Sequence, residues 1–121
     1  MERIAARFML HTKTVSVGDQ ETRRRSAALF GNEKVAEVVL ALEANHGFAR
    51  LTDVSVTAGI VHSMVRPVLG RLVEGRVLVA LPRERGRRGE QFFEVQRGAA
   101  WSALLQLSRE CVPAEAPQLG P

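Results

Sequence analysis

Apolar residues recur every three or four positions in several stretches of the chain, which is the spacing of one buried helix face. Residues 32–47 show this pattern most clearly, through the apolar side chains Val35, Val38, Val39 and Leu42. Asn32 is a preferred N-cap residue, and Gly47 stands where a C-cap glycine is common. The pattern predicts a helix over 32–47 with one face in the core.

Two neighbouring stretches predict shorter helices. Residues 21–31 read as a helix that stops at Gly31, with the arginines at 23–25 outward if Ala27, Ala28 and Phe30 face the core. Residues 48–60 contain β-branched side chains that favour a strand. Their position in the chain favours a short helix from Leu51 or Thr52 to Gly59, and we adopt that interpretation.

Helical spacing returns in residues 61–78 and again in 98–112. Pro67 lies inside the first of these stretches, where a proline costs about 3 kcal/mol or more deep in a helix. The cost falls if the helix begins near Ser63, with this serine as N-cap and Pro67 close to the first turn. Residues 98–112 predict a last helix whose apolar surface is broad for a small domain.

Alternating apolar residues predict two strands, at 76–81 and at 91–96. The connection between them, residues 82–90, is longer than an ordinary hairpin loop, and long loops that persist are often functional. It holds four arginines, at positions 83, 85, 87 and 88, together with Gly86 and Gly89. The hairpin therefore has a cationic tip.

These elements predict a single α+β domain that is mainly helical. A length of 121 residues with 45% hydrophobic residues suits one modest core. We expect an N-terminal arm over 1–20, the domain over 21–112, and a disordered tail over 113–121, which has three prolines. No run reaches the roughly 18 apolar residues of a membrane span, and the expected location is the cytoplasm.

The charge is distributed in blocks. The formal net charge of +4 divides into +3 for residues 1–30, −2 for 31–60, +4 for 61–97 and −1 for 98–121. Two basic blocks around an acidic one indicate a polyanionic partner. The excess of arginine over lysine also fits a protein from a GC-rich genome, so composition alone leaves the choice open.

Chemistry-bearing motifs are few. Cys111 is the single cysteine, which excludes an intramolecular disulfide and favours a small apolar role on the last helix. The three histidines have no companion cluster, so no metal site is expected. No nucleophile motif or phosphate-binding glycine loop with lysine is present, and we expect neither catalysis nor a cofactor.

The region 28–110 resembles the winged helix-turn-helix family of bacterial transcription regulators, of the MarR and ArsR type. The matching positions are Val54, Gly59-Ile60, the apolar series Val65, Leu69 and Leu72, and GRVL at 75–78. The resemblance implies a winged-helix fold with a two-stranded β wing and a C-terminal helix. It also implies sequence-specific binding to double-stranded DNA.

In such a fold, the helix near 63–74 would lie in the DNA major groove. The resemblance assigns DNA contact on this helix to His62, Ser63, Met64, Arg66 and Arg71. Arg66 could bind guanine bidentately, whereas Arg71 lies nearer a phosphate. The wing contacts, on the DNA backbone or in the minor groove, would come from Arg83, Arg85, Arg87 and Arg88.

The resemblance also implies a homodimer on a palindromic site. The expected dimer contacts are Phe30, Trp101, Leu104, Leu105 and Leu107, with Phe8 and Leu29 as further candidates. A small-molecule effector is possible in this family, but no residue marks its site. Operator sequence and the sign of regulation are not encoded in any visible pattern.

Three other functions stay open at this stage. An architectural or partition-type DNA binder would share every residue pattern described so far. A winged helix used for protein–protein assembly fits Pro67 and the apolar Val61 at the start of the recognition helix. An RNA-binding role is weaker, because the sequence indicates no solvent-facing aromatic platform.

Overall fold

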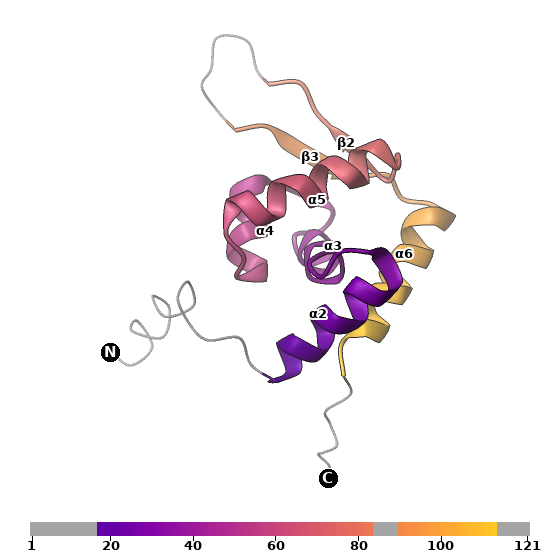
Figure 1. Ribbon diagram of the computed structural model, residues 1–121. Helices are drawn as coiled ribbons and strands as arrows, with labels where there is room; N and C mark the ends of the chain where they lie inside the picture. Colours follow the sequence, from indigo (N-terminus) through magenta and orange to yellow (C-terminus); the bar gives the residue numbers. More distant parts are fainter. Residues whose placement is uncertain (1–16, 84–89, 114–121) are drawn as a thin grey trace.

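The computed structural model describes residues 17–83 and 90–113. Within them, the helices and short strands follow one another as shown in Figure 1. They are α2 (Val17–Phe30), α3 (Val35–Ala44), β1 (Phe48–Arg50), α4 (Leu51–Ala58), α5 (His62–Glu74), β2 (Leu78–Ala80), β3 (Phe92–Val95) and α6 (Ala99–Cys111). This α+β arrangement confirms the predicted class, and the first helix begins at Val17, earlier than expected.

Helix α3 forms the centre of the molecule. Figure 1 shows it between α2 and α6 on one side and α4 and α5 on the other, and it contacts all four. Its predicted apolar face is confirmed, because Val35, Val38, Val39 and Leu42 are all buried. Burial of each such side chain contributes roughly 1.5–3 kcal/mol.

The start of α3 differs from the prediction. The helix begins at Val35, and Asn32 lies before it with its Oδ1 accepting the Lys34 backbone N–H at 2.7 Å. The free N–H of Ala36 is instead accepted by Ser26 Oγ from α2, at 3.0 Å. Asn32 therefore lies in the turn before α3 and is not its N-cap. The Ser26 hydroxyl from the preceding helix accepts a backbone N–H in the first turn of α3 instead.

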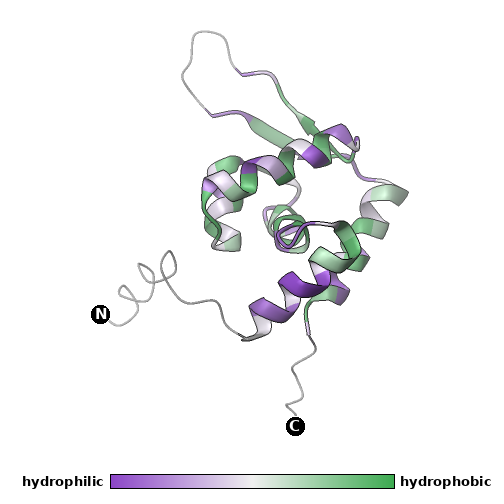
Figure 2. Ribbon diagram, viewed as in Figure 1, coloured by the Kyte–Doolittle hydropathy of each residue, from purple (hydrophilic) through white to green (hydrophobic). Residues whose placement is uncertain are grey.

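Helix α2 packs inward with a polar stripe. Thr22 and Ser26 are buried, whereas Ala27, Ala28 and Leu29 are exposed. The expectation that the alanines of this helix face the core is wrong. Figure 2 shows the middle of α2 as hydrophilic where it lies beside the more apolar α3.

An ion pair adds a further polar contact between α2 and α3. Arg23 Nε lies 2.7 Å from Glu37 Oε1 on α3, and the two side chains are 15% and 13% exposed. Arg24 and Arg25 remain exposed at the surface beside Glu21, as predicted. The three arginines were expected to behave alike, but one of them joins α2 to α3.

Helix α4 occupies the predicted short helical stretch. Gly59 ends it in the left-handed conformation, with φ of 71°. At its start, the Asp53 carboxylate accepts the Arg50 backbone N–H at 2.9 Å and two guanidinium bonds at 3.1 and 3.0 Å. In all of these bonds Arg50 donates and the Asp53 carboxylate accepts, and this one-way cap lets the chain pass from strand β1 directly into the helix.

We expect Asp53→Asn to lower the free energy of unfolding at pH 7 by about 1 kcal/mol, the usual size of a lost cap. The hydrogen bond from Arg50 holds the pKa of the Asp53 carboxyl below its usual value. The carboxylate therefore stabilises the fold above its unfolded pKa of about 3.9 and loses this effect as the pH falls through the lower native pKa.

Urea unfolding at pH 7 and pH 3 checks this prediction. The difference between the wild type and Asp53→Asn should shrink at the lower pH. The exposed Glu74, replaced by glutamine, is the matched control and should change stability little at either pH. A deficit for Asp53→Asn that is the same at both pH values would contradict the assignment.

Helix α5 begins one residue before the predicted N-cap. Val61, in an extended conformation, caps it, and the helix runs from His62 through Pro67 without a break. Ser63 is thus a helical residue and not the cap. The missing N–H of Pro67 would have bonded the carbonyl of Ser63, which is exposed and can bond water instead.

The wing is a three-stranded antiparallel sheet in the order β1-β3-β2, where two strands were expected. The unpredicted strand β1 pairs Arg50 with Phe92 and Phe48 with Glu94. It has only three residues, too few to show alternation in the sequence. Leu78 pairs with Val95 on the other edge of β3, as the predicted hairpin requires.

The predicted last helix is confirmed as α6, which packs against α3 and α2. Its buried stripe consists of Trp101, Leu105, Ser108 and Cys111. The indole Nε1–H of Trp101 donates to Glu43 Oε1 at 3.2 Å. Across the two described ranges, no helix offers the apolar length that a bilayer crossing needs.

Candidate nucleic-acid interface

One face of α5 is open to solvent, and it carries the whole set of residues predicted to contact DNA from this helix. His62, Ser63, Met64, Arg66 and Arg71 are all exposed. The opposite face is buried through Val65, Val68, Leu69 and Leu72. The helix is therefore held firmly from beneath while its polar face stays free.

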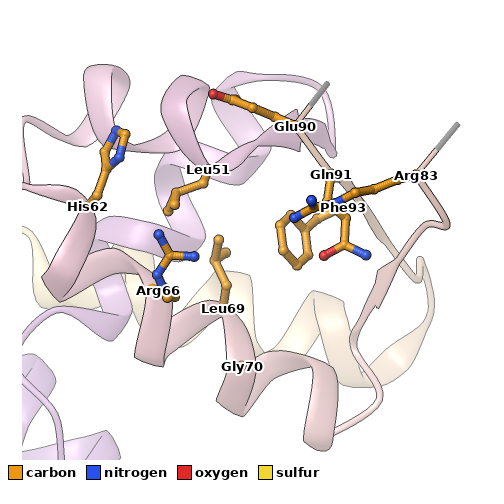
Figure 3. Close-up of a pocket in the computed structure, with 9 residues that line it drawn as sticks. All are labelled: Leu51, His62, Arg66, Leu69, Gly70, Arg83, Glu90, Gln91 and Phe93. Carbon is orange, nitrogen blue, oxygen red and sulfur yellow. The ribbon is translucent and has the colours of Figure 1, made fainter. Parts of the chain in front are cut away.

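A cavity of about 360 Å³ lies between α5 and the wing (Figure 3). Its lining residues are Leu51, His62, Arg66, Leu69, Gly70, Arg83, Glu90, Gln91 and Phe93. Three apolar side chains form part of the lining, and the guanidinium groups come from opposite sides, one from α5 and one from the wing. The cavity thus brings together Arg66, His62 and Arg83, whereas Ser63, Met64 and Arg71 lie outside it.

The base of the wing is held by hydrogen bonds beside this cavity. The Leu81 backbone N–H donates to the Phe92 carbonyl at 2.8 Å, and Gln91 Nε2 donates to the Leu81 carbonyl at 2.9 Å. Arg83 is exposed just beyond this ladder. The other predicted wing residues, Arg85, Arg87 and Arg88, lie outside the described residues.

Sequence reasoning missed two residues of this surface. Thr52, near the start of α4, lies with its Oγ1 2.7 and 2.9 Å from the two carboxylate oxygens of Glu90. The residues are 38 positions apart, so no local pattern could pair them. An acid at the end of an arginine-rich loop was the one available signal.

The outer face of the wing carries an aromatic pair that was not expected. The rings of Phe48 and Phe92 stack with centroids 4.7 Å apart and an angle of 14° between their planes. The Arg50 guanidinium lies 5.5 Å from the Phe92 centroid. Phe93, the next residue along β3, lines the cavity, so the pair points away from it.

The prediction that the chain has no solvent-facing aromatic platform is therefore wrong, because Phe48 is 49% exposed. It was missed because Phe48 belongs to the unpredicted strand β1. The platform lies on the opposite side of the sheet from Arg66 and Arg83, so it does not extend the surface formed by α5 and the cavity.

The residues expected at a dimer interface divide into three groups by their exposure. Trp101 and Leu105 are 1% and 8% exposed and belong to the core of the single chain. Phe30 and Leu104 are partly buried against that core. Leu107 is exposed, so it is the one residue of the five that offers a fully open apolar side chain. 

Other chemistry is limited in the described residues. Burial raises the pKa of the Cys111 thiol, which keeps it in the protonated, unreactive form at neutral pH. In residues 17–83 and 90–113, no three His, Cys, Asp or Glu side chains gather in a group that could hold a metal ion. The open face of α5 with the adjoining cavity is thus the candidate site.

Two solved structures are similar to this chain. The first is BpsR from Bordetella bronchiseptica, whose DNA binding is regulated by 6-hydroxynicotinic acid. BpsR is 19% identical to this chain with a TM-score of 0.56, and the similarity covers 84% of this chain and 83% of BpsR. The other, of NadR in complex with 4-hydroxyphenylacetate, is 20% identical with a TM-score of 0.54, covering 91% and 70%.

These similarities establish the fold: the chain has an α+β winged-helix architecture. No family model and no curated protein sequence matches the chain.

Proposed function

We propose that this protein binds double-stranded DNA sequence-specifically and acts as a transcriptional regulator. One observation carries the proposal: Arg66 of the exposed α5 face and Arg83 of the wing border the same cavity. A helix and a cationic wing are thus presented on one side of the molecule, as a duplex requires. The structural similarity to BpsR, a protein that binds DNA, supports this proposal.

Helix α5 is suited to the major groove. A groove about 12 Å wide admits one α-helix, and residues in the N-terminal part of the helix meet the base edges. His62, Ser63, Met64 and Arg66 are exposed in that part. Arg66 has the fork geometry that binds guanine O6 and N7 together, and Arg71, further along the helix, would contact a phosphate.

The wing supplies the contact that does not depend on sequence. Arg83 begins a run of arginines that continues at Arg85, Arg87 and Arg88. Guanidinium groups there would neutralise backbone phosphates or enter the minor groove, whose narrow form attracts arginine. The hydrogen-bonded wing base at Leu81 and Gln91 holds Arg83 beside α5.

We further propose that the protein acts as a homodimer through α2 and α6. The large exposed apolar side chains on these helices are Leu29, at 55%, and Leu107, at 42%, with Val112 just after α6 at 44%. Because α2 turns its polar stripe of Thr22 and Ser26 toward the core, its apolar Leu29 is left open to solvent. Two copies joined there would place two α5 helices on a palindromic site.

A salt titration of binding to random duplex DNA tests the proposal, followed by selection of preferred sequences from a random pool and measurement of the mass of the complex. We expect affinity to fall steeply with salt, because phosphate contacts release counterions. An enriched palindrome bound by two copies would support a dimeric regulator.

The same experiment separates the alternatives. Steep salt dependence without an enriched sequence would indicate an architectural or partition-type DNA binder. Absence of binding at low salt would reject the DNA hypothesis and favour a winged helix that assembles with another protein.

A further inference from the structure

A carboxylate lies on the face that we propose for DNA. Glu90 lines the cavity together with Arg66 and Arg83, and Figure 3 shows its side chain extending from the wing toward α4, above Leu51. An acid in this position is unexpected, because a carboxylate repels the phosphates that such a surface must approach.

The position of Glu90 is set by a specific contact. Both of its carboxylate oxygens lie within hydrogen-bond distance of Thr52 Oγ1, at 2.7 and 2.9 Å. The negative charge of Glu90 also acts on the neighbouring Arg50. The pKa of Arg50 is raised first by its hydrogen bond to Asp53 and also by the charge of Glu90. The carboxylate is therefore held across the gap between the wing and α4.

A phosphate of bound DNA would use the same groups. Threonine hydroxyls and arginine side chains are common partners of DNA phosphate oxygens. Thr52 now contacts Glu90, and the guanidinium groups of Arg66 and Arg83 line the same cavity as Glu90. The carboxylate therefore occupies a hydroxyl donor that a phosphate of bound DNA would use.

We infer that Glu90 is a built-in competitor of a backbone phosphate, which lowers the affinity of the protein for all duplex DNA until it is displaced from Thr52. This inference rests on the proposed function. The penalty should be uniform across sequences, because every duplex presents the same phosphate. Glu90 would thus limit non-specific binding by a chain whose net charge of +4 favours it.

The test compares Glu90→Gln with Glu94→Gln. Both residues are exposed and both changes remove one negative charge, but Glu94 lies on the outer face of the sheet, paired with Phe48 and Val79. We expect Glu90→Gln to tighten binding to random duplex about tenfold at low salt, because it removes a like charge at the interface. Glu94→Gln should change affinity no more than about twofold, because its charge is further from the duplex.

A double-mutant cycle with Thr52→Val tests the shared hydroxyl. If Glu90 and a phosphate compete for Thr52, the gain from Glu90→Gln should fall to about threefold or less in the Thr52→Val background. Unfolding measured alongside should show little loss of stability for Glu90→Gln, because the residue is exposed.

The outcomes are distinct. Equal effects of Glu90→Gln and Glu94→Gln, or no tightening by the first, would overturn the inference while leaving DNA binding intact. Weaker binding to one sequence alone would mean that Glu90 accepts a hydrogen bond from a base, such as cytosine N4, and would also overturn it. No DNA binding by the wild type or by Glu90→Gln would reject the proposed function, and the inference with it.

Discussion

Replacement of Arg66 by alanine is expected to weaken binding to the preferred duplex by about 1–3 kcal/mol, the discrimination carried by one bidentate contact to guanine. Binding to random duplex should change much less. Arg66 is exposed near the start of α5, and Val65 and Leu69 beside it are buried, so the loss of its side chain leaves the helix in place. Competition binding with selected and random duplexes measures the difference.

The control for this experiment is Arg71→Ala, on the same helix and also exposed. Loss of a phosphate contact should weaken binding to all sequences alike and reduce the slope of log affinity against log salt by about 0.9. If Arg66→Ala weakened binding to selected and random duplexes equally, Arg66 would be a phosphate contact and not a base contact.

Replacement of Trp101 by alanine is expected to lower the free energy of unfolding by about 3–5 kcal/mol. The side chain is 1% exposed and joins α6 to the central helix α3. It also donates to Glu43, whose pKa is lowered first by the hydrogen bond from Arg97, against an opposing effect of burial, and then by this indole bond. Truncation removes the packing and the hydrogen bond together.

Denaturant unfolding of three variants checks this second prediction. Trp101→Phe keeps most of the packing and should cost less than Trp101→Ala, which keeps the series informative if the alanine variant fails to fold. Leu107→Ala, on the exposed side of the same helix, should change stability by about 0.5 kcal/mol or less. A stable Trp101→Ala protein that loses only its dimeric state would instead place Trp101 at a subunit interface.

The sequence predicted those parts of the fold that rest on local periodicity. The apolar face of α3, helix α5 and the final helix each show their buried spacing within a few turns, whereas α4 was predicted from its position in the chain. Gly59 and the alternation in β3 were equally visible, because a left-handed turn and a strand have local requirements. The exposed face of α5 followed from its buried one.

The missed features depend on contacts between distant residues. Strand β1 is defined by its pairing with β3, more than 40 positions away. The orientation of α2 depends on Glu37 and on the backbone of Ala36, which accept or donate to polar groups that would otherwise face water. The contact between Thr52 and Glu90 likewise appears only once α4 and the wing are packed together.

The direct passage from β1 into α4 has a mechanical consequence. Arg50 is the last residue of the strand and the cap of the helix, so no flexible linker separates the sheet from the helix-turn-helix. Because β1 is also hydrogen-bonded to β3, the wing cannot tilt without carrying the first turn of α4 with it. The distance between the wing and α5 is therefore nearly fixed. If the protein binds DNA as proposed, a duplex whose groove spacing does not match this fixed distance must itself deform to fit, and its stiffness enters the affinity even where no side chain touches a base.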